Sequence, residues 1–146
     1  MIPPAIEREI LIDAPVDVVW RVVTEPEQIA QWFSYRADFE PRPAARGTLT
    51  FQDGGEVQLQ IETMDAPRRF AFRWVNPAGS VARAGNSTLV EFTLLPEAGK
   101  TRVRVVESGI DELEWSDDDR TKFVEDHSRG WDHVLGRLLD YGSRAR

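Results

Sequence analysis

The residues of this sequence best suited to acid–base or ligand chemistry are its two histidines, His127 and His133. Their spacing in a stretch with helical periodicity puts them on different faces of a helix, so we do not expect them to share a metal ion. His127 falls between Phe123 and Trp131 on the apolar face. A neutral imidazole there suits a general base or a group that orients a ligand carbonyl. It also suits a histidine whose hydrogen bonds are satisfied at a helix–sheet seam.

Most other classes of chemical site have little support. The sequence contains no cysteine, which excludes disulfides, thiolate nucleophiles and cysteine zinc sites. No serine lies in a G-x-S-x-G motif, and the glycine-containing stretches match neither a phosphate-binding loop nor a dinucleotide-binding fingerprint. The acidic run from Asp111 to Asp119 lacks the ligand pattern and central glycine of a calcium loop, so we interpret it as helix capping and solubilising charge. We expect no metal ion and no cofactor.

Length and composition limit the classes of protein further. The 146 residues, of which 41% are hydrophobic and 29% charged, predict one soluble domain over residues 1–146. The net charge of −7 makes nucleic acid an unsuitable partner. No apolar run is long enough to span a membrane, and the first ten residues lack the pattern of a signal peptide. We therefore expect a cytoplasmic protein without a membrane partner, either a monomer or a homodimer.

The longest predicted element is an amphipathic helix from Ser116 to Tyr141. Ser116 is its expected N-cap, with Asp119 at the spacing of a capping box, and Gly142 is its expected C-cap. Gly130 lies in its middle, where glycine costs about 1 kcal/mol relative to alanine. Such a glycine usually allows the close approach of another backbone or of a ligand.

A strand and two short helices are predicted before the sheet. Alternating residues from Ile6 to Ile12 predict a half-buried strand, with Arg8 on its apolar face, either at the end of the sheet or in a cavity. Asp13-Ala14-Pro15 ends this strand and starts the first helix. A capping box of Thr24 and Glu27 predicts the start of the second helix.

From Ala37 onward, short alternating segments separated by turns predict about six more strands. Asp53-Gly54-Gly55 is typical of a hairpin turn, and the stretch from Asn76 to Asn86 predicts a long loop. Hairpin connections favour an antiparallel sheet with the helices on one face, which is an α+β fold. The alternation places these side chains on one face of the sheet: Phe51, Leu59, Ile61, Phe72, Trp74, Val90 and Phe92.

The order of elements resembles the START-like helix-grip superfamily, also called SRPBCC. Several motifs resemble one branch of it, the family of homologues of the activator of heat-shock-protein-90 ATPase, and the resemblance covers essentially the whole chain. These motifs are Ile12-Asp13-Ala14-Pro15 with Val19-Trp20, Pro26 and Trp32; Pro67-Arg68-Arg69-Phe70 with Arg73-Trp74; Thr88-Leu89-Val90-Glu91-Phe92; and Gly130-Trp131 before Leu138 and Tyr141.

The resemblance implies a curved antiparallel sheet of six to seven strands wrapped around the long C-terminal helix, with two short helices after the first strand. It also implies an apolar cavity between sheet and helix. Combined with the strand alternation, this cavity predicts a ligand site lined by Trp32, Phe51, Ile61, Phe72, Trp74, Phe92, Phe123, His127, Trp131 and Leu135.

The superfamily does not imply one activity, so three functions stay open. The first is binding of a hydrophobic or aromatic small molecule, lipid- or polyketide-like. The second is a small enzyme of the cyclase or hydratase type that uses His127, Arg8 or Glu62 as acid, base or electrostatic anchor. The third is a chaperone co-regulator, which would need an exposed interaction patch. We favour binding over catalysis, because the sequence offers scattered polar candidates and no cluster of them.

Overall fold

The computed structural model describes residues 3–75 and 82–145. In these residues a seven-stranded antiparallel sheet, in the order β1-β7-β6-β5-β4-β3-β2, packs against three α-helices. The predicted α+β helix-grip fold is therefore confirmed. The strands are β1 (Ala5–Ile12), β2 (Arg36–Asp38), β3 (Arg46–Thr50), β4 (Glu56–Asp65), β5 (Arg69–Val75), β6 (Ser87–Glu97) and β7 (Lys100–Ser108); the helices are α1 (Val16–Thr24), α2 (Pro26–Trp32) and α3 (Asp117–Arg144).

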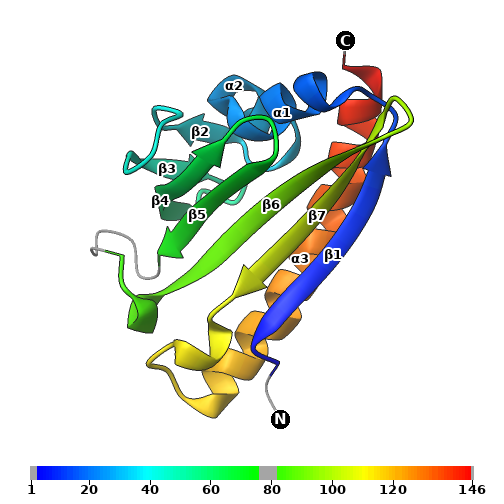
Figure 1. Cartoon of the computed structure of the whole chain (residues 1–146). Coiled ribbons are helices and arrows are strands. Elements are labelled where there is room, and N and C mark those ends of the chain that lie inside the picture. Colours follow the sequence, from blue (N-terminus) through cyan, green and yellow to red (C-terminus); the bar gives the residue numbers. More distant parts are fainter. Residues whose placement is uncertain (1–2, 76–81, 146) are drawn as a thin grey trace.

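The sheet curves around one long helix. In Figure 1, α3 runs behind β6, β7 and β1, while α1 and α2 gather near the end of the molecule where α3 finishes. The strand register brings apolar side chains into rows across the sheet, because Ile61 is opposite Phe72, Phe72 is opposite Val90, and Phe92 is opposite Val105. All five are at most 2% exposed. The period-two alternation of the sequence therefore gives one apolar face, and that face carries the core.

The hairpin between β3 and β4 closes as the sequence predicts. The Phe51 amide donates to the Gly55 carbonyl at 2.9 Å, and the Gly54 amide donates to the Phe51 carbonyl at 3.0 Å. Gly54 has a φ of 87°, which glycine adopts without a steric penalty. This turn fixes the position of Phe51 relative to β3 and β4.

Helix α3 confirms the predicted N-cap and corrects the predicted C-cap. The Ser116 side chain accepts a hydrogen bond from the Asp119 amide at 3.1 Å. Gly142 does not end the helix, which continues to Arg144 with Ala145 as its C-cap. Gly142 is instead buried against Ile12 of β1, so its lack of a side chain allows a close helix–strand approach.

The predicted capping box at the start of α2 is wrong. The Thr24 hydroxyl donates to the Trp20 carbonyl at 2.6 Å within α1, and Glu25 is the residue before α2. The two helices are joined by Trp32, whose indole N–H donates to the Val22 carbonyl at 3.0 Å. A threonine can satisfy its hydroxyl on the preceding helical turn, and that local bond competes with capping the next helix.

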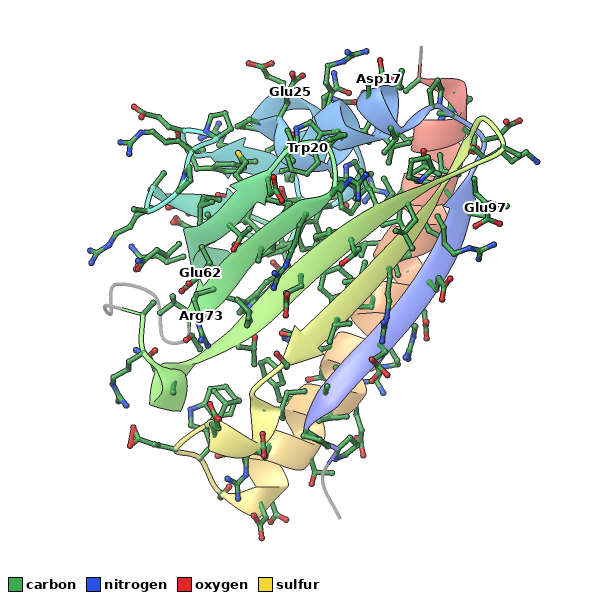
Figure 2. All side chains as sticks on the ribbon, in the orientation of Figure 1. Asp17, Trp20, Glu25, Glu62, Arg73 and Glu97 are labelled. Atoms are coloured by element: carbon green, nitrogen blue, oxygen red, sulfur yellow. The ribbon has the colours of Figure 1, made fainter. Side chains whose placement is uncertain are left out.

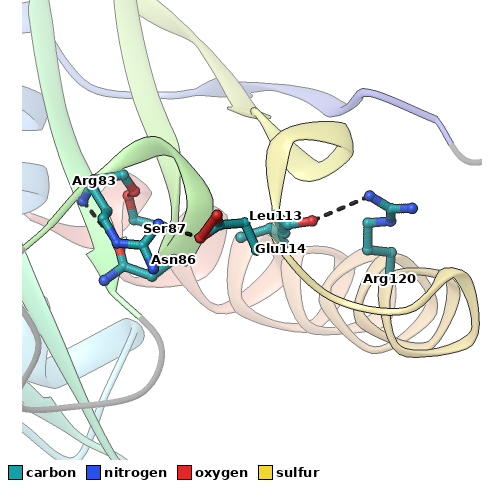
Figure 3. A network of polar contacts seen from close by, with 6 residues as sticks. All are labelled: Arg83, Asn86, Ser87, Leu113, Glu114 and Arg120. Atoms are coloured by element: carbon teal, nitrogen blue, oxygen red, sulfur yellow. Dashed lines mark hydrogen bonds and ion pairs between the residues drawn. The ribbon is translucent and has the colours of Figure 1, made fainter.

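Part of the predicted loop from Asn76 to Asn86 lies outside the described residues. Its last three residues form a short 3₁₀ helix, η1 (Ala84–Asn86), and a second one, η2 (Ile110–Glu112), precedes α3. Figure 3 shows the polar contacts that connect these two segments. Arg83 forms an ion pair with Glu114, and the Glu114 amide donates to the Gly85 carbonyl at 2.9 Å.

The same region holds the start of α3 in place. Arg120 donates to the carbonyls of Asp111 and Leu113, at 3.3 and 3.2 Å, and pairs with Asp117 (Figure 3 shows the Leu113 contact). These bonds satisfy carbonyl groups of the turn that leads into the helix. The start of α3 is therefore fixed by side-chain to backbone bonds as well as by its N-cap.

Within residues 3–75 and 82–145, no helix combines the length and apolar character that crossing a lipid bilayer requires.

Two glycines of α3 provide a matched test of this packing. An added Cβ at Gly136 meets no atom within 4 Å, whereas at Gly142 it meets Ile12 Cγ2 at 3.1 Å. We expect Gly136→Ala to raise the free energy of unfolding by about 1 kcal/mol through helix propensity. We expect Gly142→Ala to lower it, because the contact with Ile12 must be relieved. Urea denaturation measures both, and equal stabilisation by the two variants would contradict the packing described here.

Candidate functional site

An open pocket lies where α3 faces the β3–β4 hairpin and the segment that follows α2. Its volume is about 610 Å³, within the range of small-molecule sites. Trp74 of β5 and Trp131 of α3 stand on its walls, together with Phe33 and Phe51. The apolar residues that line it are Ala30, Phe33, Phe51, Val57, Trp74, Trp131 and Val134.

The aromatic wall of the pocket is held together by ring–ring contacts. Phe33 stacks on Trp131 with ring centroids 5.5 Å apart, and it meets Phe51 and Trp74 at 6.0 Å each. Phe51 and Trp74 are 5.8 Å apart. Offset and edge-to-face contacts of this kind stabilise by about 0.5–1.5 kcal/mol per pair beyond burial, so the wall is formed before any ligand arrives.

A fully buried carboxylate, Glu107 of β7, lies behind this wall. Its side chain is 0% exposed and is within hydrogen-bond distance of three side chains. The Thr88 hydroxyl donates to Oε2 at 2.6 Å, and the Trp131 indole N–H donates to Oε1 at 2.9 Å. His127 Nδ1 lies 2.8 Å from Oε1 and 3.1 Å from Oε2. Since a buried carboxylate without partners is costly, these bonds are what allow Glu107 to sit in the core.

Strand periodicity explains why Glu107 points inward. Val103 and Val105 are buried on the inner face of β7, and Glu107 continues their alternation. Its partner across the sheet is Val90 of β6, while Thr88 continues the alternation of β6. On α3, His127 and Trp131 are four residues apart and so lie one turn above the other. The sheet thus provides the acceptor, Glu107, and the helix provides His127 and Trp131, which lie within hydrogen-bond distance of it.

His127 joins the buried carboxylate to the pocket. Its ring stacks on Phe123 with centroids 3.7 Å apart and meets the Trp74 ring edge-on at 5.2 Å. Its side chain is 18% exposed and lines the pocket. Nδ1 is directed to Glu107, so the ring is fixed in rotation and Nε2 is the nitrogen left for other partners.

Four of the ten predicted ligand-binding residues line the pocket: Phe51, Trp74, His127 and Trp131. The other six, Trp32, Ile61, Phe72, Phe92, Phe123 and Leu135, are buried in the core and do not line it. Several of them support the wall from behind, since Phe92 meets Trp131 at 6.0 Å and Trp32 stacks on Phe33 at 5.2 Å. Contact of any of the ten with a ligand stays a prediction.

The two further candidates for acid–base chemistry lie away from the pocket. Arg8 donates from Nε to Asp132 of α3 at 2.7 Å, so it joins the edge strand to the helix. Glu62 is 46% exposed and pairs with Arg73 at 3.5 Å on the sheet, where Figure 2 labels both residues. Neither residue lines the pocket.

The mouth of the pocket is predominantly acidic. Asp53, Glu56 and Asp126 line it together with one guanidinium group, that of Arg137. All four are exposed. His133 also lines this region and is exposed.

Sequence reasoning missed Glu107, Thr88 and the residues of the mouth. For Glu107 and Thr88 a signal exists, because both continue the inward alternation of a predicted strand. The mouth residues lie in the β3–β4 turn, at the first position of β4 and on the exposed side of α3, where the sequence has no period that marks a pocket. In the described part of the chain, no group of three or more His, Asp or Glu residues is placed to hold a metal ion.

The model of the family described as "Activator of Hsp90 ATPase homolog 1-like protein" matches residues 13–142. The chain belongs to this family. No curated protein matches the sequence significantly. This family and the helix-grip fold are consistent with a ligand-binding domain.

Solved structures share the fold. Protein MLL2253 from Mesorhizobium loti is 22% identical with a TM-score of 0.80, over 96% of this chain and 97% of that one. The Aha1 dimer from Colwellia psychrerythraea is 18% identical with a TM-score of 0.77, over 96% of each chain. DynU16, a protein in the dynemicin biosynthetic locus, is 27% identical with a TM-score of 0.74, over 95% of this chain and 47% of that one.

The hydrogen bonds around Glu107 predict a difference between two identical substitutions. Glu107→Gln replaces one acceptor oxygen with an N–H₂ group that faces donors, so we expect the free energy of unfolding to fall by about 2 kcal/mol. Glu62→Gln, on an exposed side chain, should change it by no more than about 0.5 kcal/mol. Urea denaturation of the two variants measures this, and an equal effect at both positions would show that Glu107 is not held by its donors.

Proposed function

We propose that this protein binds a hydrophobic or aromatic small molecule, lipid- or polyketide-like, in the pocket between α3 and the β3–β4 hairpin. The observation that carries this proposal is an open pocket of about 610 Å³ with a preformed aromatic wall. A site of this size, mostly apolar and with a few polar groups, is typical of small-molecule binding. A flat apolar ligand laid against Trp74 and Phe51 would bury surface on both partners, at about 25 cal/mol per Å² of apolar area.

Gly130 gives independent support. It lines the pocket one position before Trp131, and an added Cβ there meets no atom within 4 Å. Because Gly130 has no side chain, the helix leaves space beside the aromatic wall, and a ligand can occupy that space.

The arrangement of polar groups favours binding over catalysis. An enzyme of the cyclase or hydratase type would need several polar groups that converge on the reacting atoms. Among the described residues that line the pocket, the carboxylates and the guanidinium group lie exposed at the mouth, and His127 is the partly buried titratable group. One fixed imidazole beside an aromatic wall fits recognition of a ligand. The occurrence of DynU16 in a biosynthetic locus also supports a role with small molecules.

Two leucine substitutions in α3 test the location of the site. Gly130→Leu places a side chain into the pocket, whereas Gly136→Leu places the same side chain on an open part of the helix that does not line it. We expect the wild type and Gly136→Leu to bind aromatic and acyl compounds with equal affinity. Gly130→Leu should weaken this binding at least about tenfold, which corresponds to about 1.4 kcal/mol.

Isothermal titration calorimetry measures these affinities, after a thermal-shift screen has selected the compounds. Circular dichroism of both variants checks that α3 is intact. Equal binding by Gly130→Leu and Gly136→Leu would place the ligand elsewhere. A wild-type protein that binds none of the compounds would contradict the proposed function itself.

A further inference from the structure

We infer that His127 Nε2 is a hydrogen-bond acceptor that selects ligands with a neutral hydroxyl group, a phenol or an enol, on a flat apolar body. This inference rests on the proposed function, and it names the class of ligand. It also gives a role to Glu107, which lies behind the pocket wall and does not line the pocket.

The surroundings of Glu107 determine which nitrogen of His127 carries the proton. The Trp131 indole N–H can only donate, and the Thr88 hydroxyl lies 2.6 Å from the other carboxylate oxygen. Both of these groups donate to Glu107, and an ionised carboxylate can only accept, so we assign the proton of the third contact, at 2.8 Å, to His127 Nδ1. In a neutral imidazole whose Nδ1 carries the proton, Nε2 has a free lone pair. A ligand group that meets Nε2 must then be a donor, which excludes the carbonyl that the sequence alone allowed.

Packing keeps this nitrogen in a constant position. The imidazole is stacked on Phe123 at 3.7 Å and bounded by the edge of Trp74 at 5.2 Å, while both carboxylate oxygens hold Nδ1. In the described part of the chain, the hydrogen bonds of the His127 ring are made by Nδ1. An acceptor that is fixed in advance loses little entropy when it binds, so it can discriminate between ligands.

The side chains around the His127 ring indicate the shape and charge of the rest of the ligand. Trp74 touches the imidazole ring, and Phe51 continues the same wall. A hydroxyl attached directly to a flat ring can reach the histidine while the ring lies against Trp74. The three carboxylates and single guanidinium group at the mouth disfavour an anionic ligand, so a neutral hydroxyl is preferred over a carboxylate.

Three probes of similar shape test this inference: 2-naphthol, 2-methoxynaphthalene and naphthalene. Only 2-naphthol can donate a hydrogen bond, and naphthalene controls for the size of the methyl group. We expect wild-type protein to bind 2-naphthol about tenfold more tightly than either other probe, as measured by calorimetry. In His127→Phe, which keeps a flat ring and removes the acceptor, we expect the three affinities to become equal. Gly130→Leu should weaken all three.

The outcomes separate this inference from the proposed function. Equal affinities of the three probes for the wild type, each weakened by Gly130→Leu, would overturn the inference and leave the pocket as a binding site. A preference for 2-naphthol that persists in His127→Phe would also overturn it, because a group other than His127 would then accept the hydrogen bond from the hydroxyl. Failure of all three probes to bind the wild type would overturn the inference and count against the proposed function. If His127→Phe does not fold, the wild-type comparison of 2-naphthol with its methyl ether decides the question.

Discussion

One carboxylate buried among hydrogen-bond donors is the constraint on which the rest of the site depends. Glu107 is fully buried, so its partners must remain within hydrogen-bond distance if the fold is to be stable. Thr88 comes from the neighbouring strand, while His127 and Trp131 come from successive turns of α3. These bonds set both the rotation of α3 and its distance from the sheet. A helix turned by one residue would lose two of the three donors.

The same constraint separates a closed core from an open pocket. Trp131 is 4% exposed and lies between the two, with Phe92 on its core side and Phe33 on its pocket side. Toward β1, α3 approaches closely because Gly142 allows contact with Ile12. Toward the β3–β4 hairpin, α3 stands away from the sheet, and the space between them is the pocket. The position of α3 therefore determines both the packing of the core and the size of the pocket.

The order of strands and helices could be predicted from the sequence because its signals are local, whereas the curvature of the sheet around α3 was implied by the family resemblance. Alternation in the strands, the hairpin glycines and the Ser116 cap each depend on a few neighbouring residues. The pocket could not be predicted in the same way, since which aromatic rings remain uncovered depends on how far α3 lies from a distant hairpin. Strand alternation predicts both Phe51 and Phe72 on the inner face of the sheet, yet one lines the pocket and the other is in the core. Glu107 was recognisable by its alternation with Val103 and Val105, but a charged residue in a strand normally indicates the solvent face.

The most direct measurement is the ¹⁵N chemical shift of the two His127 ring nitrogens in the free protein, by long-range ¹H–¹⁵N correlation at pH 8. We expect a single tautomer, with the proton on Nδ1 and a bare Nε2, because Glu107 accepts from Nδ1. His133, which is exposed, gives the second histidine signal and serves as an internal reference. A proton on Nε2 of His127, or shifts averaged over both tautomers, would contradict the arrangement around Glu107 on which both the pocket and its selectivity depend.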